Sequence, residues 1–214
     1  VYEVMEHIIK NHPDVLFEGC SGGGGRFDLG WLYYMPQIWT SDDSDAIERL
    51  EIQEGTSMVY PACTMGAHVS AVPNHQVGRI TPLKTRGLVA MSGQFGYELD
   101  LAKLSDEEFE EVKEQIKLYK EIRETVQHGE MYRLKSPQKD NCAAWEYVNG
   151  DDVVLFYHNI LARANSPYER VKLCGLDENA KYKDVETGKI YGGDYLSKFG
   201  MYKTHGSEFT SEIT

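Results

Sequence analysis

Apolar residues fall at helical spacing in three stretches of the chain, 1–11, 44–56 and 105–126. The last stretch gives the clearest signal, because Ser105 and Glu108 form a capping box at its start. We therefore predict a helix in each stretch. For the last helix, the predicted buried face consists of Phe109, Val112, Ile116, Tyr119, Ile122 and Val126.

Short apolar runs bounded by glycine, proline and polar residues predict strands between these helices. The runs are 15–17, 37–40, 58–60, 68–72 and 88–91. Strands that alternate with helices are typical of a parallel α/β fold, and a complete (β/α)8 TIM barrel takes ~250 residues. We therefore predict that residues 1–129 form the C-terminal half of such a barrel.

The pattern changes after residue 129, where short β-rich segments are separated by Asn-Gly, Asp-Asp and Gly-Gly turn signals. No helix of useful length is expected there, and residues 130–214 are predicted to form an all-β domain. The fold class is thus α/β plus all-β. Between the two strands predicted at 68–72 and 88–91, residues 73–87 form a long polar loop of the kind that serves function or assembly.

Composition excludes several classes of protein. A net charge of −12 argues against general nucleic-acid binding, which needs clusters of Lys and Arg. No apolar run approaches the 18 or more residues of a membrane span, and the first residues do not resemble a signal peptide. The chain lacks an initiator Met and begins inside a predicted helix, so we expect a piece of a longer soluble protein.

The cysteine and histidine spacings predict no metal site. Cys20, Cys63, Cys142 and Cys174 are far apart without a CxxC pair, which favours a reduced, cytoplasmic protein over a disulfide framework or a zinc site. His68 and His75 lack the HExxH pattern and are interpreted as structural or loop residues. No cofactor is expected.

Polar residues follow each of the first two predicted strands, which is where a parallel α/β barrel places its active site. After the strand at 37–40 come Asp42, Asp43 and Asp45, which could also cap the following helix. We assign capping to Asp43 and Asp45. Asp42 lies nearest the strand and is the candidate catalytic acid, because glycoside hydrolysis needs a carboxylic acid to protonate the leaving oxygen.

The strand at 15–17 leads to Cys20 and to the glycines at 22–25. These glycines match neither the P-loop nor a convincing dinucleotide motif. Glycine also allows a backbone to approach a ligand closely, which is our interpretation here. Cys20 has no neighbouring His or second Cys in sequence, so a contact at a pocket wall is favoured over a nucleophile.

Two stretches resemble family 36 α-galactosidases. FEGCSGGGGRFDLGWLYYMPQIWTSDDSDAIERLEIQEGTSMVYP is similar to the catalytic-barrel signature of that family, and MGAHVSAVPNHQVGRITPLKTRGLVAMSGQFGYELDL to the segment that follows it. The resemblance covers essentially the whole chain and implies the last strands of the barrel plus a C-terminal antiparallel β-sandwich domain. The sequence departs from the family pattern at Leu29 and Trp31, where Pro and a smaller aliphatic residue are expected.

The resemblance also implies residue roles. The family retains anomeric configuration through a covalent galactosyl-enzyme, and its acid/base aspartate corresponds to Asp42. Its galactose-contacting segment corresponds to Cys20, Ser21, Gly22 and Gly23. The family nucleophile lies in a Lys-Trp-Asp motif, which is absent from these 214 residues. The nucleophile is therefore expected in an N-terminal remainder, without which the chain would be inactive and would expose sheet edges.

The implied activity is hydrolysis of α-1,6-linked galactosides such as melibiose and raffinose. Family members are commonly tetramers, so a homo-oligomer is expected, with residues 73–87 as a possible contact. A related α-N-acetylgalactosaminidase or galactosyl transferase is the alternative enzyme. From another class, a non-catalytic galactose-binding module would use the glycine turn and the aromatic residues as a lectin-like site, since aromatic rings stack on sugars.

Overall fold

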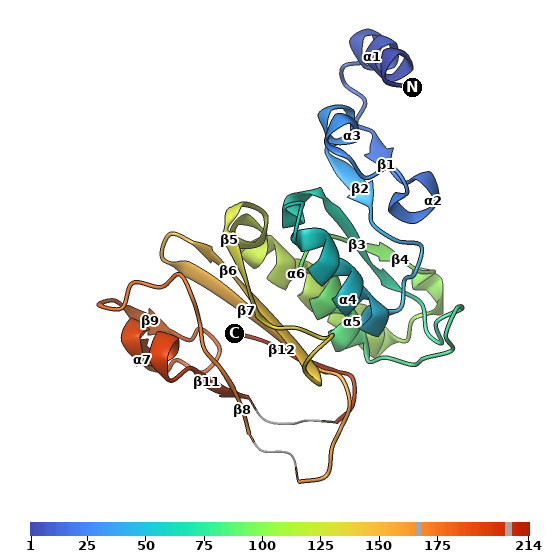
Figure 1. Cartoon of the computed structure of the whole chain (residues 1–214). Coiled ribbons are helices and arrows are strands. Elements are labelled where there is room, and N and C mark those ends of the chain that lie inside the picture. The colour runs from blue at the N-terminus through green and yellow to red at the C-terminus, as the bar shows by residue number, and fades with distance from the viewer. Residues whose placement is uncertain (166–167, 204–206) are drawn as a thin grey trace.

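The N-terminal part of the computed structural model alternates helices with parallel strands (Figure 1). The structure describes residues 1–165, 168–203 and 207–214. The parallel sheet has the order β1-β2-β3-β4. The elements are α1 (Tyr2–Asn11), β1 (Glu18–Gly19), α2 (Ser21–Gly24), α3 (Leu29–Tyr34), β2 (Gln37–Trp39), α4 (Ala46–Ser57), β3 (Met65–Ser70), α5 (Leu83–Ala90), β4 (Gln94–Glu98) and α6 (Asp106–His128).

Antiparallel strands dominate the rest of the chain. One sheet has the order β12-β7-β6-β5, and two smaller pairings join β8 to β11 and β9 to β10. The elements are β5 (Glu130–Lys135), β6 (Cys142–Asn149), β7 (Asp152–Asn159), β8 (Glu169–Val171), β9 (Lys181–Lys183), β10 (Ile190–Gly192), α7 (Gly193–Lys198), β11 (Met201–Lys203) and β12 (Thr210–Ile213). The short helix α7 was not predicted.

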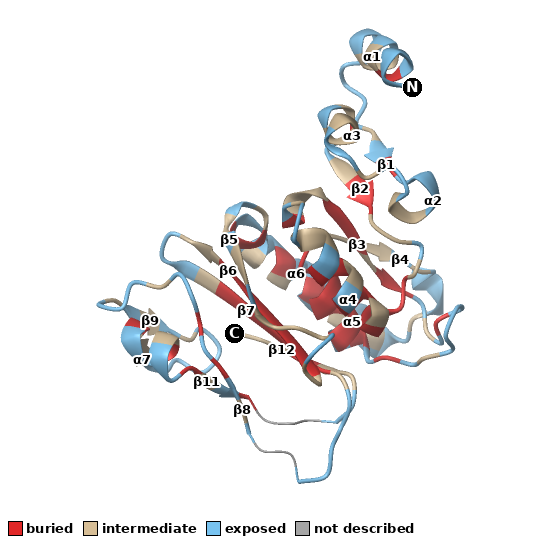
Figure 2. Ribbon diagram, in the orientation of Figure 1, coloured by how far each residue is buried: buried red, intermediate tan, exposed pale blue. Residues whose placement is uncertain are grey.

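The main core joins the two parts of the chain. Helices α4, α5 and α6 pack with the inner face of β6 and β7, and the buried residues there come from both sides of residue 129 (Figure 2). Hydrogen bonds also join the two parts. Trp145 Nε1 donates to Ser92 Oγ over 2.9 Å, and the Tyr147 hydroxyl donates to the Ser92 carbonyl over 2.8 Å. A separate core lies between β6, β7 and the 171–201 segment.

Helix α5 corrects the prediction of a loop over 73–87 and a strand over 88–91. All of its residues except Lys84 are buried. The polar residues of α5, Lys84 to Arg86, are consecutive and two of them are buried, so the sequence shows no amphipathic period, and a short apolar run does not separate helix from strand. Gly87 matters here, because a Cβ atom on it would clash with the side chain of Gln115 on α6.

The predicted strands at 15–17, 58–60 and 68–72 were misplaced. The pairing of Glu18 with Gln37 would put Phe17 opposite Pro36, which has no N–H to extend the ladder. Residues 58–60 instead form a turn after α4. Strand β3 starts earlier than predicted, at Met65, because its first residues pair with β2 although glycine and alanine have low strand propensity.

Helix α6 matches its predicted span and its capping box, and it ends at Gly129. Its predicted buried face is only partly buried. Val112, Tyr119 and Val126 lie in the core, whereas Phe109 and Ile116 are exposed.

Residues 1–39 project from the body as an arm made of α1, β1, α2, α3 and β2 (Figure 1). The arm exposes large apolar side chains, namely Val1, Tyr2, Val4, Val15, Leu16, Leu29 and Tyr33. A concentration of exposed apolar groups marks a surface that contacts a partner. No helix in the described part of the chain is long and apolar enough to cross a membrane.

Candidate active site

The glycine-rich segment after β1 forms a left-handed turn. Ser21, Gly22, Gly23 and Gly24 all have positive φ, from 56° to 85°. The N–H of Gly24 closes the turn by donating to the Cys20 carbonyl over 2.8 Å. A left-handed conformation costs a residue with a Cβ atom roughly 1–2 kcal/mol, which explains why glycine occupies most of the turn.

This turn packs directly against the segment that follows β2. A Cβ atom on Gly23 would lie 2.5 Å from the backbone nitrogen of Asp42 and 3.2 Å from its carboxyl carbon. A Cβ atom on Gly24 would lie 2.6 Å from the Thr40 carbonyl oxygen. Only glycine permits an approach this close. The structure therefore brings the glycine turn and Asp42 together at the carboxyl ends of neighbouring parallel strands.

The three carboxylates after β2 have different environments. Asp45 caps α4 by accepting from two N–H groups of its first turn, each at 3.1 Å, and it pairs with Arg79. Asp43 accepts from the Asp45 N–H over 3.0 Å. Asp42 is exposed, and its carboxylate has no hydrogen-bond or ion-pair partner among residues 1–165, 168–203 and 207–214. Asp42 alone is free to act on a ligand.

The backbone on both sides of this free carboxylate is held from several elements. Arg49 Nη1 donates to the Ser41 carbonyl over 3.1 Å. Ser70 Oγ donates to the Ser44 carbonyl over 2.7 Å, and the Ser44 N–H donates to Gln76 Oε1 over 3.3 Å. Groups fixed this way lose little freedom when a ligand binds, which is what precise placement of a reacting group needs.

Arg49 also contacts the end of β2. Arg49 is buried, with 2% of its surface exposed. Its guanidinium carbon lies 4.6 Å from the Trp39 ring centroid, and Nη2 donates to the Gly66 carbonyl over 2.5 Å. Burial lowers the pKa of Arg49 to about 10, so the group stays charged at neutral pH. The Trp39 ring in turn stacks on His68, with centroids 4.6 Å apart.

A pocket of about 270 Å³ opens beside the glycine turn. Cys20 and Ser21 line it together with Arg26 and Trp31, whereas Gly22, Gly23 and Asp42 lie outside its lining. The structure thus places Cys20 and Ser21 on a concave wall and puts Gly23 against Asp42. The Cys20 thiol is free and exposed.

The arrangement supplies one proton-transfer group rather than a complete hydrolytic pair. A retaining glycosidase needs a second carboxylate ~5–5.5 Å away as nucleophile. Asp43 and Asp45 are occupied by the backbone and by Arg79. No group of three or more His, Cys, Asp or Glu side chains in the described ranges could hold a metal.

The sequence analysis did not identify the residues that position the Asp42 segment. Arg49 offered a signal, because it lies three residues after Ala46 and so shares the buried face of α4. A polar residue on an apolar face is usually satisfied by a specific partner. Arg79 and Ser70 offered no comparable signal, since their partners are far away in sequence.

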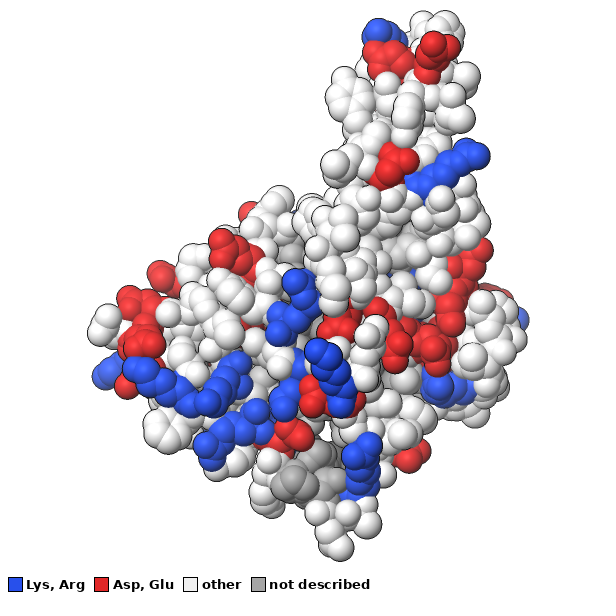
Figure 3. Space-filling model, viewed as in Figure 1, with Lys and Arg blue, Asp and Glu red and all other residues white. Residues whose placement is uncertain are grey.

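The charge distribution around the site is acidic. Figure 3 shows Asp and Glu side chains gathered over and beside α4, whereas Lys and Arg are more frequent over the C-terminal β part. Such a surface favours a neutral ligand over a polyanion such as nucleic acid.

Two family models match the chain. Residues 1–129 match the family model Melibiase, and residues 142–214 match the model of the glycosyl hydrolase family 36 C-terminal domain.

Among similar proteins, alpha-galactosidase AgaA of Geobacillus stearothermophilus is 55% identical over 94% of this chain. Probable alpha-galactosidase G of Aspergillus terreus is 47% identical over 100% of it. The chain spans only 28% and 30% of the lengths of these two relatives.

Solved structures give the same result. An AgaA variant crystallised with raffinose matches 99% of this chain with a TM-score of 0.95 and 53% identity. The galactosidase domain of the α-galactosidase–sucrose kinase AgaSK matches with a TM-score of 0.96 and 47% identity. This chain covers 30% of each of those two chains.

Proposed function

This chain belongs to the melibiase family, glycoside hydrolase family 36, and on that premise we propose that it is the C-terminal portion of a retaining α-galactosidase. The complete enzyme would remove terminal α-linked galactose from oligosaccharides such as melibiose and raffinose. One observation carries the proposal: the exposed Asp42 carboxylate, which has no partner among the described residues, lies against a left-handed glycine turn at the carboxyl ends of parallel strands.

In the proposed mechanism, Asp42 is the general acid/base. An aspartate from the N-terminal remainder attacks the anomeric carbon of galactose while the Asp42 carboxyl donates its proton to the departing glycosidic oxygen. Water then attacks the galactosyl-enzyme, and Asp42 takes up a proton from that water as the bond to the nucleophile breaks. Two inversions give net retention. Cys20, Ser21, Gly22 and Gly23 would contact the galactose hydroxyls.

The proposed fold of residues 1–129 is the C-terminal half of a (β/α)8 barrel, followed by a β-sandwich domain over 130–214. One face of β3 and β4 packs on α5 and α6 through Ala67, Val69 and Phe95. On the other face, a Cβ atom on Gly96 would lie 2.8 Å from the His68 ring. Closure of a barrel would turn this second face inward.

The N-terminal remainder would supply the nucleophile and cover the exposed apolar arm. Within the part of the chain that the structure describes, strand β1 pairs with β2 alone, so its outer edge is open to a further strand. We also propose a homo-oligomer, a tetramer, in which the 73–87 segment makes a contact through residues 75–80, which are exposed apart from Arg79, because residues 83–87 are buried in α5 except for Lys84. A reducing, cytoplasmic location fits the free thiols of Cys20, Cys63, Cys142 and Cys174. No cofactor is required by the mechanism.

The test is hydrolysis by the complete protein of three p-nitrophenyl glycosides: the α-galactoside, the β-galactoside and the α-N-acetylgalactosaminide. We expect turnover of the α-galactoside, with α-galactose as the first product seen by proton NMR. Preference for the N-acetylated sugar, or transfer of galactose to sugar acceptors instead of water, would favour the alternative enzymes. Binding of galactose without turnover would favour a non-catalytic module.

The contact between Gly23 and Asp42 predicts a sensitive position. In the complete enzyme, Gly23→Ala is expected to lower kcat for melibiose about tenfold or more, because the added methyl group displaces Asp42 and small displacements of a reacting group are costly. Steady-state kinetics would measure this effect.

The matched control is Gly55→Ala in α4, where a Cβ atom would meet no atom within 4 Å and the backbone is right-handed. It should leave kcat unchanged and stabilise the helix by roughly 0.5–1 kcal/mol. Equal kcat values for the two variants would show that the turn does not position Asp42.

A further inference from the structure

A second pocket lies entirely in the C-terminal β part, and its lining contains no residue before Asp151. Its volume is about 400 Å³, which falls in the ~300–1,000 Å³ range of small-molecule sites. The floor is apolar and fixed, because Leu155, Leu173 and Leu196 belong to the second core and are at most 5% exposed. A preformed cavity of this kind is suited to hold a ligand without rearranging.

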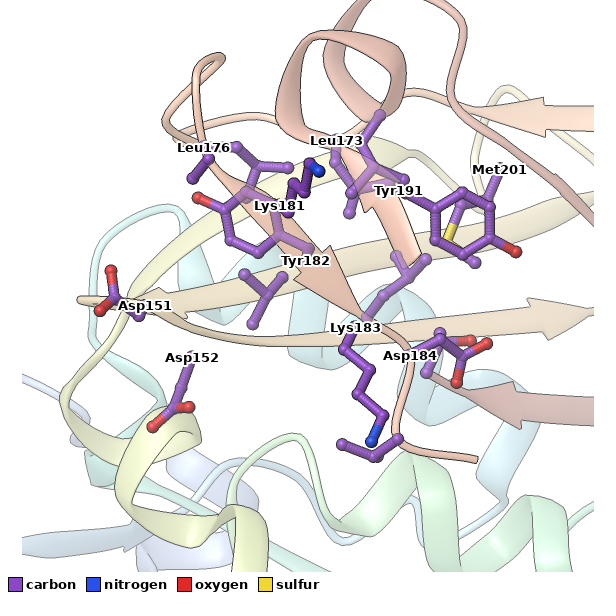
Figure 4. A pocket seen from close by; sticks show the side chains of 16 residues that line it. Asp151, Asp152, Leu173, Leu176, Lys181, Tyr182, Lys183, Asp184, Tyr191 and Met201 are labelled. Carbon is purple, nitrogen blue, oxygen red and sulfur yellow. The ribbon is translucent and has the colours of Figure 1, made fainter. Parts of the chain in front are cut away.

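Two tyrosines form an aromatic wall of this pocket (Figure 4). Tyr182 on β9 and Tyr191 on β10 are direct partners in the antiparallel register, so their side chains lie on the same face of that hairpin. Both are half-buried. The Tyr182 hydroxyl accepts from the Asp177 N–H over 3.0 Å, which leaves its own proton available to a ligand.

Charged groups of both signs surround the opening. Asp151 lies in the turn between β6 and β7, Asp152 begins β7, and Lys181 and Lys183 lie on β9 (Figure 4). All of these except Asp151 lie within strands, and none has a hydrogen-bond or ion-pair partner on its side chain among the residues that the structure describes. The rim of the pocket therefore offers carboxylate oxygens that can accept hydrogen bonds from a ligand and ammonium groups that can donate them.

This combination selects a ligand class. The carboxylates repel a phosphate or another anion, and the ammonium groups repel a metal ion. A neutral polyhydroxylated molecule satisfies both, because its hydroxyl groups donate to carboxylates and accept from ammonium groups. Its C–H faces pack on tyrosine rings, which combine an apolar surface with a polar end.

We propose that this pocket is a second, non-catalytic site for a neutral oligosaccharide of the enzyme's own substrate class. The proposal rests on the proposed α-galactosidase function for the identity of the sugar. The pocket shares no lining residue with the pocket beside the glycine turn, so binding there would hold an oligosaccharide on the enzyme without affecting the hydrolysis of small substrates.

The experiment is calorimetric titration of the complete enzyme with stachyose while its active site is saturated with 1-deoxygalactonojirimycin, a compound bound by an AgaA variant in a solved structure. We expect a residual binding event in the wild-type enzyme. Tyr182→Ala and Tyr191→Ala should each weaken it about tenfold, as expected for loss of an aromatic anchor. Asp152→Asn combined with Lys183→Met, at exposed positions that do not threaten folding, should also weaken it.

The matched control is Tyr168→Ala, which removes a tyrosine that is exposed and lies outside the pocket. It should bind stachyose like the wild type, and every variant should hydrolyse melibiose at the wild-type rate. Absence of residual binding in the wild type would overturn the proposal. So would residual binding that persists at wild-type strength in both tyrosine variants and in the double rim variant. Failure of the wild type to hydrolyse melibiose would instead reject the proposed function, while residual binding still tests the pocket.

Discussion

Replacing Asp42 by Asn in the complete enzyme is expected to lower kcat for melibiose by about 10³-fold, within the 10²–10⁴-fold range of general acid–base catalysis. The amide cannot protonate the departing sugar oxygen, and it cannot take a proton from the attacking water. Because Asp42 has no partner in the described part of the chain, the substitution breaks no ion pair or hydrogen bond there. The loss would therefore be catalytic, and steady-state kinetics on melibiose measures it.

A second readout identifies the role of Asp42 specifically. A p-nitrophenolate leaving group needs little protonation, so with p-nitrophenyl α-galactoside the variant should form the galactosyl-enzyme but hydrolyse it slowly. The result would be a low kcat together with a low KM. Added azide attacks without a general base, so it should restore turnover and yield α-galactosyl azide, with the aspartate nucleophile as leaving group.

The control for this prediction is Asp43→Asn, one residue along the chain. The Asp43 carboxylate accepts from the Asp45 N–H, and an amide oxygen can accept the same bond. This variant should keep kcat within a few-fold of the wild type. If Asp43→Asn lost as much activity as Asp42→Asn, or if azide rescued neither, Asp42 would not be the acid/base.

The stability of the C-terminal β part is expected to fall as the pH rises from about 4.5 to about 7, because Glu146 is buried inside it. Its side chain faces the second core and is fully buried, with the Cys174 N–H as its donor. Burial raises the pKa of Glu146 to about 7. Above its ordinary pKa of 4.5 the unfolded chain releases the proton that the folded chain retains.

The sign and size follow from linkage between protonation and folding. Below pH 4.5 both states are protonated and Glu146 has no cost. Above pH 7 both are ionised, and the folded state bears the full cost of a buried charge, on the order of 3 kcal/mol. Glu146→Gln should therefore stabilise the protein at pH 8 and leave it nearly unchanged at pH 4.5. Calorimetric thermal midpoints of the complete enzyme at these two pH values check this.

An exposed glutamate on α6 provides the control, and Glu114→Gln should shift the midpoint little at either pH. His158 acts in the opposite direction, because burial lowers its pKa to about 3 and so favours unfolding below pH 6.5. At pH 8 His158 is neutral in both the folded and the unfolded state, so a higher thermal midpoint of Glu146→Gln at that pH reports on Glu146 alone. If Glu146→Gln failed to raise the midpoint at pH 8 relative to the wild type, Glu146 would not carry this cost.

The sequence predicted the elements whose signals are local. Helix α6 was found because the Ser105–Glu108 capping box and its apolar spacing lie within the helix itself. Helix α5 was missed because its three polar residues are consecutive and mostly buried, so the sequence shows no amphipathic period there. Strand β1 was misplaced because its start depends on Pro36, which only the register with β2 brings opposite it.

The same distinction holds for the candidate site. The capping role of Asp45 and the free position of Asp42 could be predicted, since both follow from their places between a strand and a helix. The close approach of Gly23 to Asp42 and the hydrogen bond from Ser70 to the Ser44 carbonyl join segments far apart in sequence, and the hydrogen bond from Arg49 to the Ser41 carbonyl depends on how α4 packs below β2. Only the folded structure provides them.

The shared core has a consequence for recombination between relatives. Trp145 and Tyr147 reach across residue 129 to bond Ser92, and the α5–α6 segment packs on β6 and β7. A chimaera joined at residue 129 would set one parent's helices against the other parent's sheet, with mismatched packing across the join. Because α4 belongs to the same core, crossover ahead of Asp45, the N-cap of α4, would transfer the three helices and the sheet as one inherited unit, and hybrids made there should yield more folded protein.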